Sequence, residues 1–377
     1  MNSRIAAQGD FRSRGVIYRR ATKADDAELR ALLHDNDMDW WVNLCFEREP
    51  SFFDGESLMG ESAAVIALDE SKQSSPVGMY SCSFLPVHIN GHHERAGYLG
   101  GLRVDRKYRR RVRILKDGFA SIPALLSEGD LVPLWFTSVG EDNGTARRIL
   151  EADLAGMPRY GFRGAMETLA FSIRQRKTGG LLQRATIGDI SALADFYNQQ
   201  ACAFQFAPFL TESWLSSLNG KQGLCLDDFL LLKDRGEIQG CLAVWDQRKF
   251  KQTNIRGYRF PLNRLRGVYN LYAAARSRIM LPAPGEKLEQ VFLSFFALDK
   301  YAQYLAADVV KEGLLRVAEK NALVGTLGLS DRNPLTDTLK SILHPDCYRT
   351  RIETVSWPGE VQPDLDSRPV QPEVAIL

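Results

Sequence analysis

The feature that most constrains how this chain can fold is an internal repeat, in which short patterns recur in the same order. One pattern, Arg-Ala-Thr with an Asp three residues after the Thr, lies at residues 20–25 and again at 184–189. In each copy the Thr can cap a helix, and the Asp lies in the first turn, where the helix dipole favours an acid. The match predicts that a short strand and a capped helix occur twice.

Two later patterns extend the repeat. An apolar strand ends in Asp at residues 102–105 and 296–299, and a strand of small residues leads to an Asn at 135–143 and 325–333. Three landmarks in one order predict two copies of one unit. Their separation grows from 164 to 194 positions, which indicates an insertion of about 30 residues in the second copy. Residues 250–284, with apolar residues at helical spacing, fit that insertion.

The repeat predicts the domain organisation of the 377 residues. A length of this order favours two domains. We expect a first domain at 1–175 and a second at 181–358, joined by the polar, glycine-ended segment 174–180. Residues 359–377 carry several prolines and little periodicity, and are predicted to form a flexible tail.

The order of strands and helices predicts an α/β fold class. Each copy is expected to form a mixed, mostly antiparallel sheet flanked by helices, with one parallel pair around the central helix. In the first copy the pattern predicts a second helical stretch at 38–48 and a final strand at 164–173.

Composition narrows the class of function. The formal net charge is only +2, so no global field indicates a nucleic-acid or acidic-membrane partner. The six Cys form no CxxC pair, which predicts reduced thiols and a cytoplasmic location. The start has no secretory-signal pattern and no apolar run is long enough to span a bilayer, so no membrane association is expected.

His88, His92 and His93 are the one cluster of potential metal ligands that the sequence brings together. They flank Asn90-Gly91, a pair typical of a two-residue hairpin turn. The histidines are therefore expected to be exposed turn residues, and no metal site is predicted.

Two segments of the first copy resemble the GCN5-related N-acetyltransferase (GNAT) family. The strand Gly97–Val104 followed by Asp105–Arg109 and a helix resembles the family's acyl-coenzyme A segment, and Asn143, Ala146 and Tyr160-Gly161-Phe162 resemble its second block. Counted once per copy, the resemblance covers most of the chain and implies a tandem member. It implies acetyl-CoA, or another acyl-CoA, as donor and no metal.

The family places the pyrophosphate of the donor at the helix start, where backbone N–H groups and the helix dipole favour an anion. This sequence departs from the family pattern, because Val112 and Ile114 occupy the glycine slots. Neighbouring arginines can compensate, although the alternative of a solvated basic face stays open. The resemblance implies cofactor contacts at Leu102, Arg103, Val104, Arg109, Arg110, Arg111, Val112, Arg113, Ile114 and Asn143.

The matching loop of the second copy is more degenerate. Gln303 and Ala306 fit the family's pattern, but Asp308 takes the last slot, where an acid would repel phosphate. We expect this copy to complete or cover the acceptor cleft without binding a cofactor.

Acyl transfer to an amine also needs a base and an acceptor pocket. Glu141, Asp105 and Tyr160 are the catalytic candidates, although strand-end acids commonly cap helices and Tyr160 can serve packing. Leu150 occupies the position at which the family has the Tyr that acts as general acid. Acidic groups and aromatic ring faces can bind a cationic amine. Alternatively, the segment is a capped helix with one of its Trp rings in the core. The pocket candidates are Asp37, Asp39, Trp40 and Trp41.

The sequence thus predicts an acyl-CoA-dependent N-acyltransferase, with acetyl as the expected acyl group, working by direct attack of an amine on the thioester. The acceptor is expected to be a small-molecule or peptide amine, and the oligomeric state is not indicated. Two alternatives remain: an inactive binding module that kept the fold, supported by the missing glycines and Tyr, and a tRNA-dependent aminoacyl or peptidyl transferase. The near-neutral charge argues against the latter.

Overall fold

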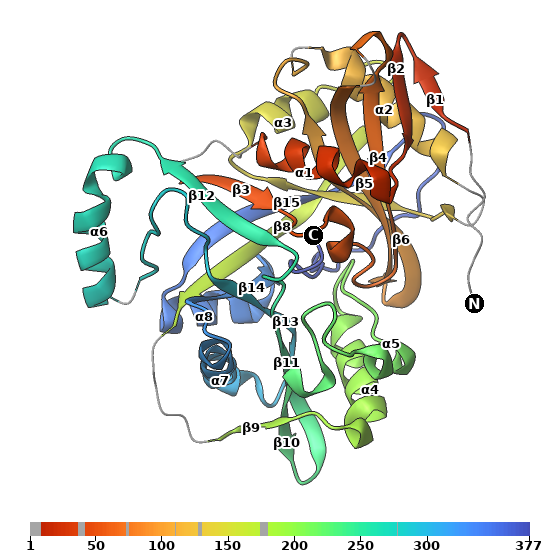
Figure 1. The fold of residues 1–377 in the computed structure, drawn as a ribbon. Coiled ribbons are helices and arrows are strands. Elements are labelled where there is room, and N and C mark those ends of the chain that lie inside the picture. Colours follow the sequence, from red (N-terminus) through yellow and green to blue (C-terminus); the bar gives the residue numbers. More distant parts are fainter. Residues whose placement is uncertain are drawn as a thin grey trace.

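A large twisted sheet with helices on both faces forms the centre of the molecule (Figure 1). The computed structural model describes residues 9–36, 42–72, 75–109, 111–126, 130–173, 180–276 and 278–377. Within them, thirteen strands form one sheet in the order β1-β2-β4-β5-β6-β7-β15-β8-β14-β13-β11-β10-β9, and β12 pairs with β3 in a second, two-stranded sheet.

The first half of the chain contains eight strands and three helices within the described residues. They are β1 (Phe11–Ser13), β2 (Val16–Arg20), α1 (Asp26–His34), β3 (Val42–Glu47), β4 (Glu61–Asp69), β5 (Ser75–Ile89), β6 (His92–Val104), α2 (Val112–Leu125), β7 (Trp135–Gly140), α3 (Gly144–Leu150) and β8 (Arg159–Ser172).

The second half repeats this order with an insertion. Its elements are β9 (Leu182–Arg184), α4 (Ile190–Ala201), α5 (Glu212–Ser217), β10 (Phe229–Asp234), β11 (Glu237–Trp245), β12 (Gln252–Tyr258), α6 (Leu262–Arg276), β13 (Gln290–Leu298), α7 (Ala306–Glu319), β14 (Val324–Ser330), α8 (Pro334–Leu343) and β15 (Asp346–Ser356).

The repeat seen in the sequence is present in atomic detail. Thr22 and Thr186 each form a capping box with the Asp three residues later, and their backbone angles agree within a degree. Asn143 and Asn333 each cap the helix that follows the third landmark, α3 and α8. Each copy has one parallel pair, β6 with β7 and β13 with β14, and the other neighbours in the large sheet are antiparallel. The predicted α/β class with a mixed sheet is confirmed.

The two halves exchange their last strands. β8, from the first half, lies beside β14 of the second, whereas β15, from the second half, lies beside β7 of the first. The exchanged strands also pair with each other, from Asp346 opposite Ala170 to Ser356 opposite Arg159. The sheet is therefore continuous across both halves. Of the predicted linker 174–180, residues 174–179 lie outside the described residues.

The hydrophobic core lies in layers on both faces of the sheet. In the first half α1 and α2 cover opposite faces, and in the second half α4 and α7 do the same. None of the helices in the described part of the chain is long and apolar enough to cross a membrane.

The predicted second helical stretch at 38–48 is wrong where the structure describes it. Residues 42–47 form the strand β3, and 37–41 lie outside the described residues. β3 pairs with β12 from the insertion, with Thr253 opposite Phe46, so this local preference is decided by a partner about 200 residues away in the chain.

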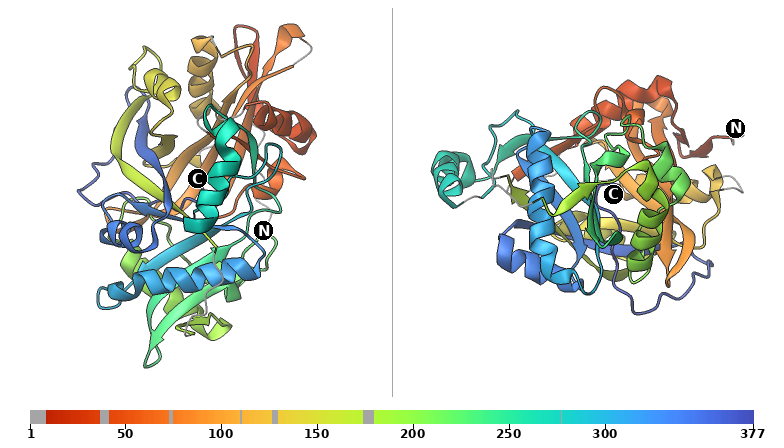
Figure 2. Two further views of the ribbon diagram at one scale, coloured as in Figure 1. Left: turned by 90° about the vertical axis from the view of Figure 1, so that its left-hand side faces the viewer. Right: turned by 90° about the horizontal axis from the view of Figure 1, so that it is seen from below.

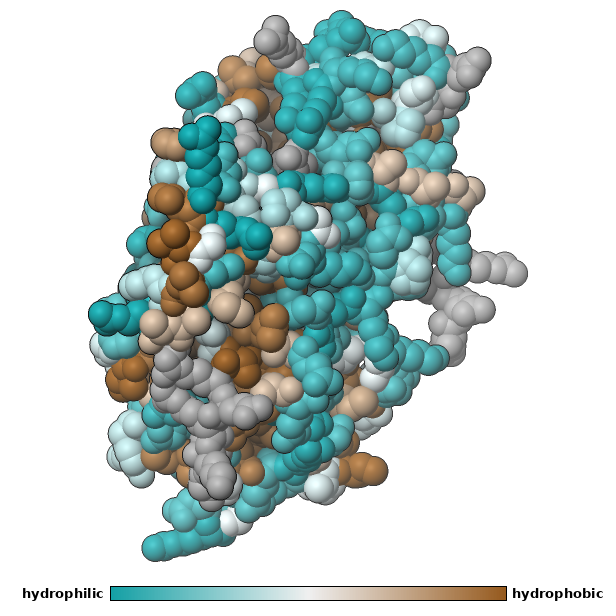
Figure 3. Space-filling model, turned by 60° about the vertical axis from the view of Figure 1, so that its left-hand side comes forward, coloured by the Kyte–Doolittle hydropathy of each residue, from teal (hydrophilic) through white to brown (hydrophobic). Residues whose placement is uncertain are grey.

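The insertion also carries α6, as its helical spacing predicted. The helix stands out from the body of the protein (Figures 1 and 2) and is fastened by Arg266 and Asn270, which both donate to the carbonyl oxygen of Leu281. Four of its apolar or aromatic side chains are exposed, namely Leu265, Val268, Leu271 and Tyr272. Brown, hydrophobic areas are visible at the surface of this side of the protein (Figure 3).

The hairpin at Asn90-Gly91 is confirmed, with both residues in left-handed conformations between β5 and β6. The expectation that all three nearby histidines are exposed is wrong for His88, which is buried beside Phe209. His93 is exposed and stacks on the same ring at 3.9 Å.

The expected flexible tail, residues 359–377, packs into the molecule instead. Val370 and Ala375 are buried, and the backbone N–H of Gln371 donates to the carbonyl oxygen of Gln205. The prolines correctly predicted an irregular backbone. The apolar residues between the prolines nevertheless pack into the hydrophobic core.

Candidate functional site

The parallel strands β6 and β7 separate part-way along their length. Their pairing ends at Leu99 opposite Thr137, and the Thr137 hydroxyl donates to the Leu99 carbonyl oxygen at 2.7 Å. Beyond this point, among the described residues, β6 pairs only with β5, and β7 only with β15. We call this opening the first splay. Gly101 and Leu102 are exposed along its edge.

The second copy has an equivalent opening, the second splay, after Leu293 opposite Leu327. Here the C-terminal segment fills the space. The Glu373 carboxylate accepts hydrogen bonds from the Phe295 backbone N–H at 3.0 Å and the Ser294 hydroxyl at 3.2 Å. All five residues from 294 to 298 are buried, in contrast to the open edge of the first splay.

Gln371 and Val374 complete the filling of the second splay. The Gln371 side-chain oxygen accepts from the Ser330 backbone N–H at 3.1 Å and from the Asn333 side chain at 2.8 Å. Val374 packs so closely on Gly328 that a Cβ there would come within 2.3 Å of it. The protein's own chain therefore occupies the strand edges that remain open in the first copy.

We predict that Glu373→Ala lowers the free energy of unfolding by about 1–3 kcal/mol, because the buried Phe295 N–H loses its acceptor. Chemical denaturation of both proteins would measure the difference. Asp364→Ala, at an exposed position of the same segment, is the control and should change little. Equal stabilities for wild type and Glu373→Ala would show that the segment does not brace the second splay.

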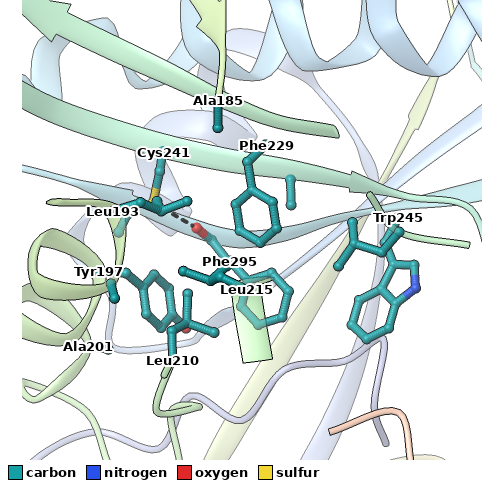
Figure 4. Close-up of a cluster of buried hydrophobic side chains, with 14 of the residues drawn as sticks. Ala185, Leu193, Tyr197, Ala201, Leu210, Leu215, Phe229, Cys241, Trp245 and Phe295 are labelled. Carbon is teal, nitrogen blue, oxygen red and sulfur yellow. Dashed lines mark hydrogen bonds between the residues drawn. The ribbon is translucent and has the colours of Figure 1, made fainter. Parts of the chain in front are cut away.

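A bulge shapes both splays, and the residue at its centre differs. Gly101 has φ +64° and Phe295, 194 positions later, has φ +53°. At the second position the Phe295 ring fills the core (Figure 4), and the Cys241 thiol donates to its carbonyl oxygen at 3.2 Å. The ring is packed among Tyr197, Trp214, Phe229 and Trp245. Gly101 leaves the matching space in the first copy without a side chain.

The predicted cofactor residues divide between the two strands and the start of α2. Leu102, Arg103 and Val104 lie on β6 along the first splay. Asn143 does not point to a ligand, because its side chain caps α3 by accepting from the Ala146 N–H at 3.1 Å.

The basic residues at the start of α2 are only partly engaged by the protein. Arg109 donates to the Asn36 side chain at 2.9 Å, Arg111 lies over the Tyr108 ring at 4.9 Å, and Arg113 is exposed. Arg110 lies outside the described residues.

The two residues in the family's glycine slots point in different directions. Val112 is exposed, whereas Ile114 is buried and its carbonyl oxygen accepts from the Tyr18 hydroxyl. Ile114 therefore does not crowd an anion at this helix start, and Val112 is the one large side chain in these slots at the surface.

The three predicted catalytic residues are held by structural contacts. The Glu141 carboxylate pairs with Arg349 at 3.0 Å, and the Asp105 carboxylate accepts from the Lys107 N–H at 2.8 Å. Tyr160 lies in the strand β8, and its ring contacts Phe119. Burial raises the pKa of Tyr160 well above its usual value. Within the described part of the chain, its strand β8 pairs with β14 and β15 and with neither strand of the first splay, which favours a packing role.

The predicted acceptor residues Asp37, Asp39, Trp40 and Trp41 lie outside the described residues. The segment after them, from β3 to Gly60, packs against β5, where Gly60 lies on the Phe84 carbonyl oxygen.

Sequence reasoning missed a charged cluster on this segment. Burial raises the pKa of Glu56 to about 7, and the nearby positive charge of Arg48 partly opposes this rise. The Glu56 Oε1 atom is shielded from solvent and has no hydrogen-bond partner among the described residues. Arg48 lies over the Phe52 ring at 4.6 Å, and burial lowers its pKa.

The cluster extends to the first splay through β6. Arg103 and Tyr98 both interact electrostatically with Arg48, and the Tyr98 hydroxyl bonds Ser138 of β7 at 2.8 Å. The Tyr98–Ser138 bond links the two strands where they begin to separate. The sequence offered one signal for this position, the Gly100-Gly101 pair inside a strand, which is typical of a bulge or a close approach.

Comparison with known proteins supports the fold. No family model matches the sequence, and no curated protein matches it. Two structures of Saccharomyces cerevisiae N-myristoyltransferase with bound myristoyl-CoA match with TM-scores of 0.61 and 0.63 at 12% and 11% identity. Each match covers 95% of this chain, and 88% and 84% of the yeast chains.

A third structure comes from the GCN5-related glucosamine N-acetyltransferase region of a fungal multi-domain GH3 β-N-acetylglucosaminidase. It matches with a TM-score of 0.57 at 14% identity, over 91% of this chain and 38% of that one. The chain thus has a GNAT-type fold in a tandem arrangement, as the repeat predicted. At these identities the likeness is one of fold.

Proposed function

We propose that this protein is an acyl-CoA-dependent N-acyltransferase that binds its donor in the first copy. The observation that carries the proposal is the contrast between the two splays: the first has open strand edges, whereas Gln371, Glu373 and Val374 fill the second. An extended amide-bearing arm such as pantetheine can pair with open strand edges. The pyrophosphate would lie at the start of α2, near Arg111 and Arg113.

Glu56 is the proposed general base. It takes a proton from the acceptor ammonium, and the neutral amine then forms a bond to the thioester carbonyl carbon. The nitrogen of the tetrahedral intermediate then loses its surplus proton to solvent. The carbon–sulfur bond breaks, and the coenzyme A thiolate leaves with the bonding electron pair. Tyr98 is the proposed proton donor to that thiolate, because burial raises its pKa and keeps the hydroxyl protonated.

Acetyl, or another short acyl group, is the proposed cargo. The inner end of the first splay is closed by the Tyr98–Ser138 bond, and Phe136 behind it is stacked on Phe206 at 4.4 Å. A long chain would have to displace this packed pair, which costs free energy.

Calorimetric titration with acetyl-CoA tests donor binding, and thiol release in the presence of amines tests transfer. We expect micromolar binding, and rates that fall as the donor is lengthened from acetyl to myristoyl. Faster transfer from myristoyl-CoA would contradict the preference for a short acyl group and would leave the proposed acyltransferase activity standing. A folded protein that binds no acyl-CoA would contradict the enzyme and favour the binding module.

A further inference from the structure

We call the cluster formed by Arg48, Glu56 and Arg103 the acceptor side of the first splay, and its positive groups outnumber its negative groups. Arg48 and Arg103 contribute two guanidinium groups and Glu56 one carboxylate. Lys251 interacts electrostatically with Arg48 and with Glu373. Among the described residues, the two guanidinium groups outnumber the one carboxylate that interacts with Arg48.

Within the residues that the structure describes, neither arginine donates a hydrogen bond to an acid. Arg48 donates to the Phe52 carbonyl oxygen at 3.3 Å, and Arg103 to the Leu102 carbonyl oxygen at 2.9 Å. The Arg103 Nε atom is shielded from solvent and has no partner in the described part of the chain. A guanidinium carries five donors, so both groups can accept an anionic ligand.

The unpaired acid and one of the arginines are adjacent. A Cβ placed on Gly55, the residue before Glu56, would lie 3.7 Å from the Arg48 Nε atom. A ligand that satisfies both groups must therefore carry its positive and negative ends close together. A buried charge without a partner is costly, and binding such a ligand would relieve that cost at both ends.

We propose that the acceptor is a small amine that bears a carboxylate next to the amine, as an α-amino acid does, with its ammonium toward Glu56 and its carboxylate toward Arg48 and Arg103. This inference rests on the proposed function. It narrows the acceptor from any small-molecule or peptide amine to a class in which both charges lie on one carbon.

The test compares free amino acids with their methyl esters and amides in the thiol-release assay with acetyl-CoA. We expect amino acids to be acylated with a kcat/KM at least about tenfold above that of the matching esters, since one charge-assisted bond contributes roughly 1.5–3 kcal/mol. In Arg48→Gln and Arg103→Gln, the KM for amino acids should rise about tenfold or more, so that the kcat/KM for amino acids falls about tenfold further than the kcat/KM for esters. Arg332→Gln, at an exposed position of the second half, is the control.

The outcomes separate the two proposals. Esters or plain amines acylated as well as amino acids, or amino-acid KM values unchanged in both arginine variants, would overturn the acceptor class and leave the acyltransferase standing. A folded protein that binds no acyl-CoA would overturn both. Equal losses for acids and esters in the variants would assign the arginines a structural role and also overturn the carboxylate contact.

Discussion

Replacing Glu56 with Gln is expected to lower kcat/KM for acyl transfer by roughly 10²–10⁴-fold, the usual contribution of a placed general base. The affinity for acyl-CoA should not change, because the Glu56 segment borders the acceptor side of the first splay. Steady-state kinetics with acetyl-CoA, together with calorimetry, would separate these two effects. Asp54→Asn, an exposed acid two residues away, is the matched control.

The pH dependence gives a second readout of the same variant. Glu56 has a pKa of about 7, so activity in the wild type should rise as pH increases through 7, where the base becomes ionised. Glu56→Gln should lack this rise. A wild-type profile without a group near pH 7, or a variant that retains it, would contradict the role of Glu56.

Stability should move in the opposite direction from activity. The folded-state pKa of Glu56 lies above the ordinary value of 4.5, so between pH 4.5 and 7 the folded protein binds more protons than the unfolded chain. The contribution of Glu56 to stability therefore falls as pH rises through this window, and the ionised form is least favourable above 7. At pH 8 Glu56→Gln should unfold at a higher temperature than wild type, because the variant lacks an unfavourable buried charge. A carboxylate that stabilises the fold would give the opposite result.

The sequence predicted the fold well because the repeat depends on local chemistry. Capping boxes at Thr22 and Thr186, and Asn caps at 143 and 333, are set by residues three or fewer positions apart. The exchange of β8 and β15 could not be predicted this way, since it depends on which of two equivalent edges each strand joins. β3 was mistaken for a helix for the same reason: its partner, β12, lies in the insertion.

The strand and the helix that frame the candidate site were predicted from the sequence, and the structure has both, as β6 and α2. The roles of the residues in the site stay predictions. Glu56 and Arg48 lie in a segment without periodicity or motif, and their importance arises from burial against β6 and Phe52, which only the tertiary structure shows. Strand-end acids were favoured instead, and in the structure they form a turn and an ion pair.

One exchange explains why two copies of the unit can have different roles. At the bulge, Gly101 leaves room beside the first splay, whereas Phe295 in the same backbone conformation fills the second. A left-handed conformation is uncommon for a bulky residue, so Phe295 depends on the packing around it. The second copy thus has a packed core where the first copy has an open strand edge, and its Lys251 donates to the Ala375 carbonyl oxygen of the C-terminal segment.

The start of α2 supplies the remaining large effect. In the double variant Arg111→Ala/Arg113→Ala, the dissociation constant for acetyl-CoA should rise roughly 10²-fold, because each charge-assisted contact to phosphate contributes about 1.5 kcal/mol or more. Positive side chains at a helix N-terminus are unfavourable unless an anion lies there, so the variant should be no less stable than wild type without ligand. Calorimetric titration and thermal unfolding would measure both quantities.

Lys300→Ala is the matched control, because Lys300 is exposed at the corresponding loop of the second copy, before α7. It should leave acetyl-CoA affinity unchanged if the donor binds only in the first copy. The wild-type affinity should also fall with added salt, since exposed charge contacts are screened, and the double variant should show a weaker salt dependence. If Lys300→Ala lost acetyl-CoA binding and the double variant kept it, the donor would have to be assigned to the second copy. The C-terminal segment would then have to leave the second splay before the donor could enter.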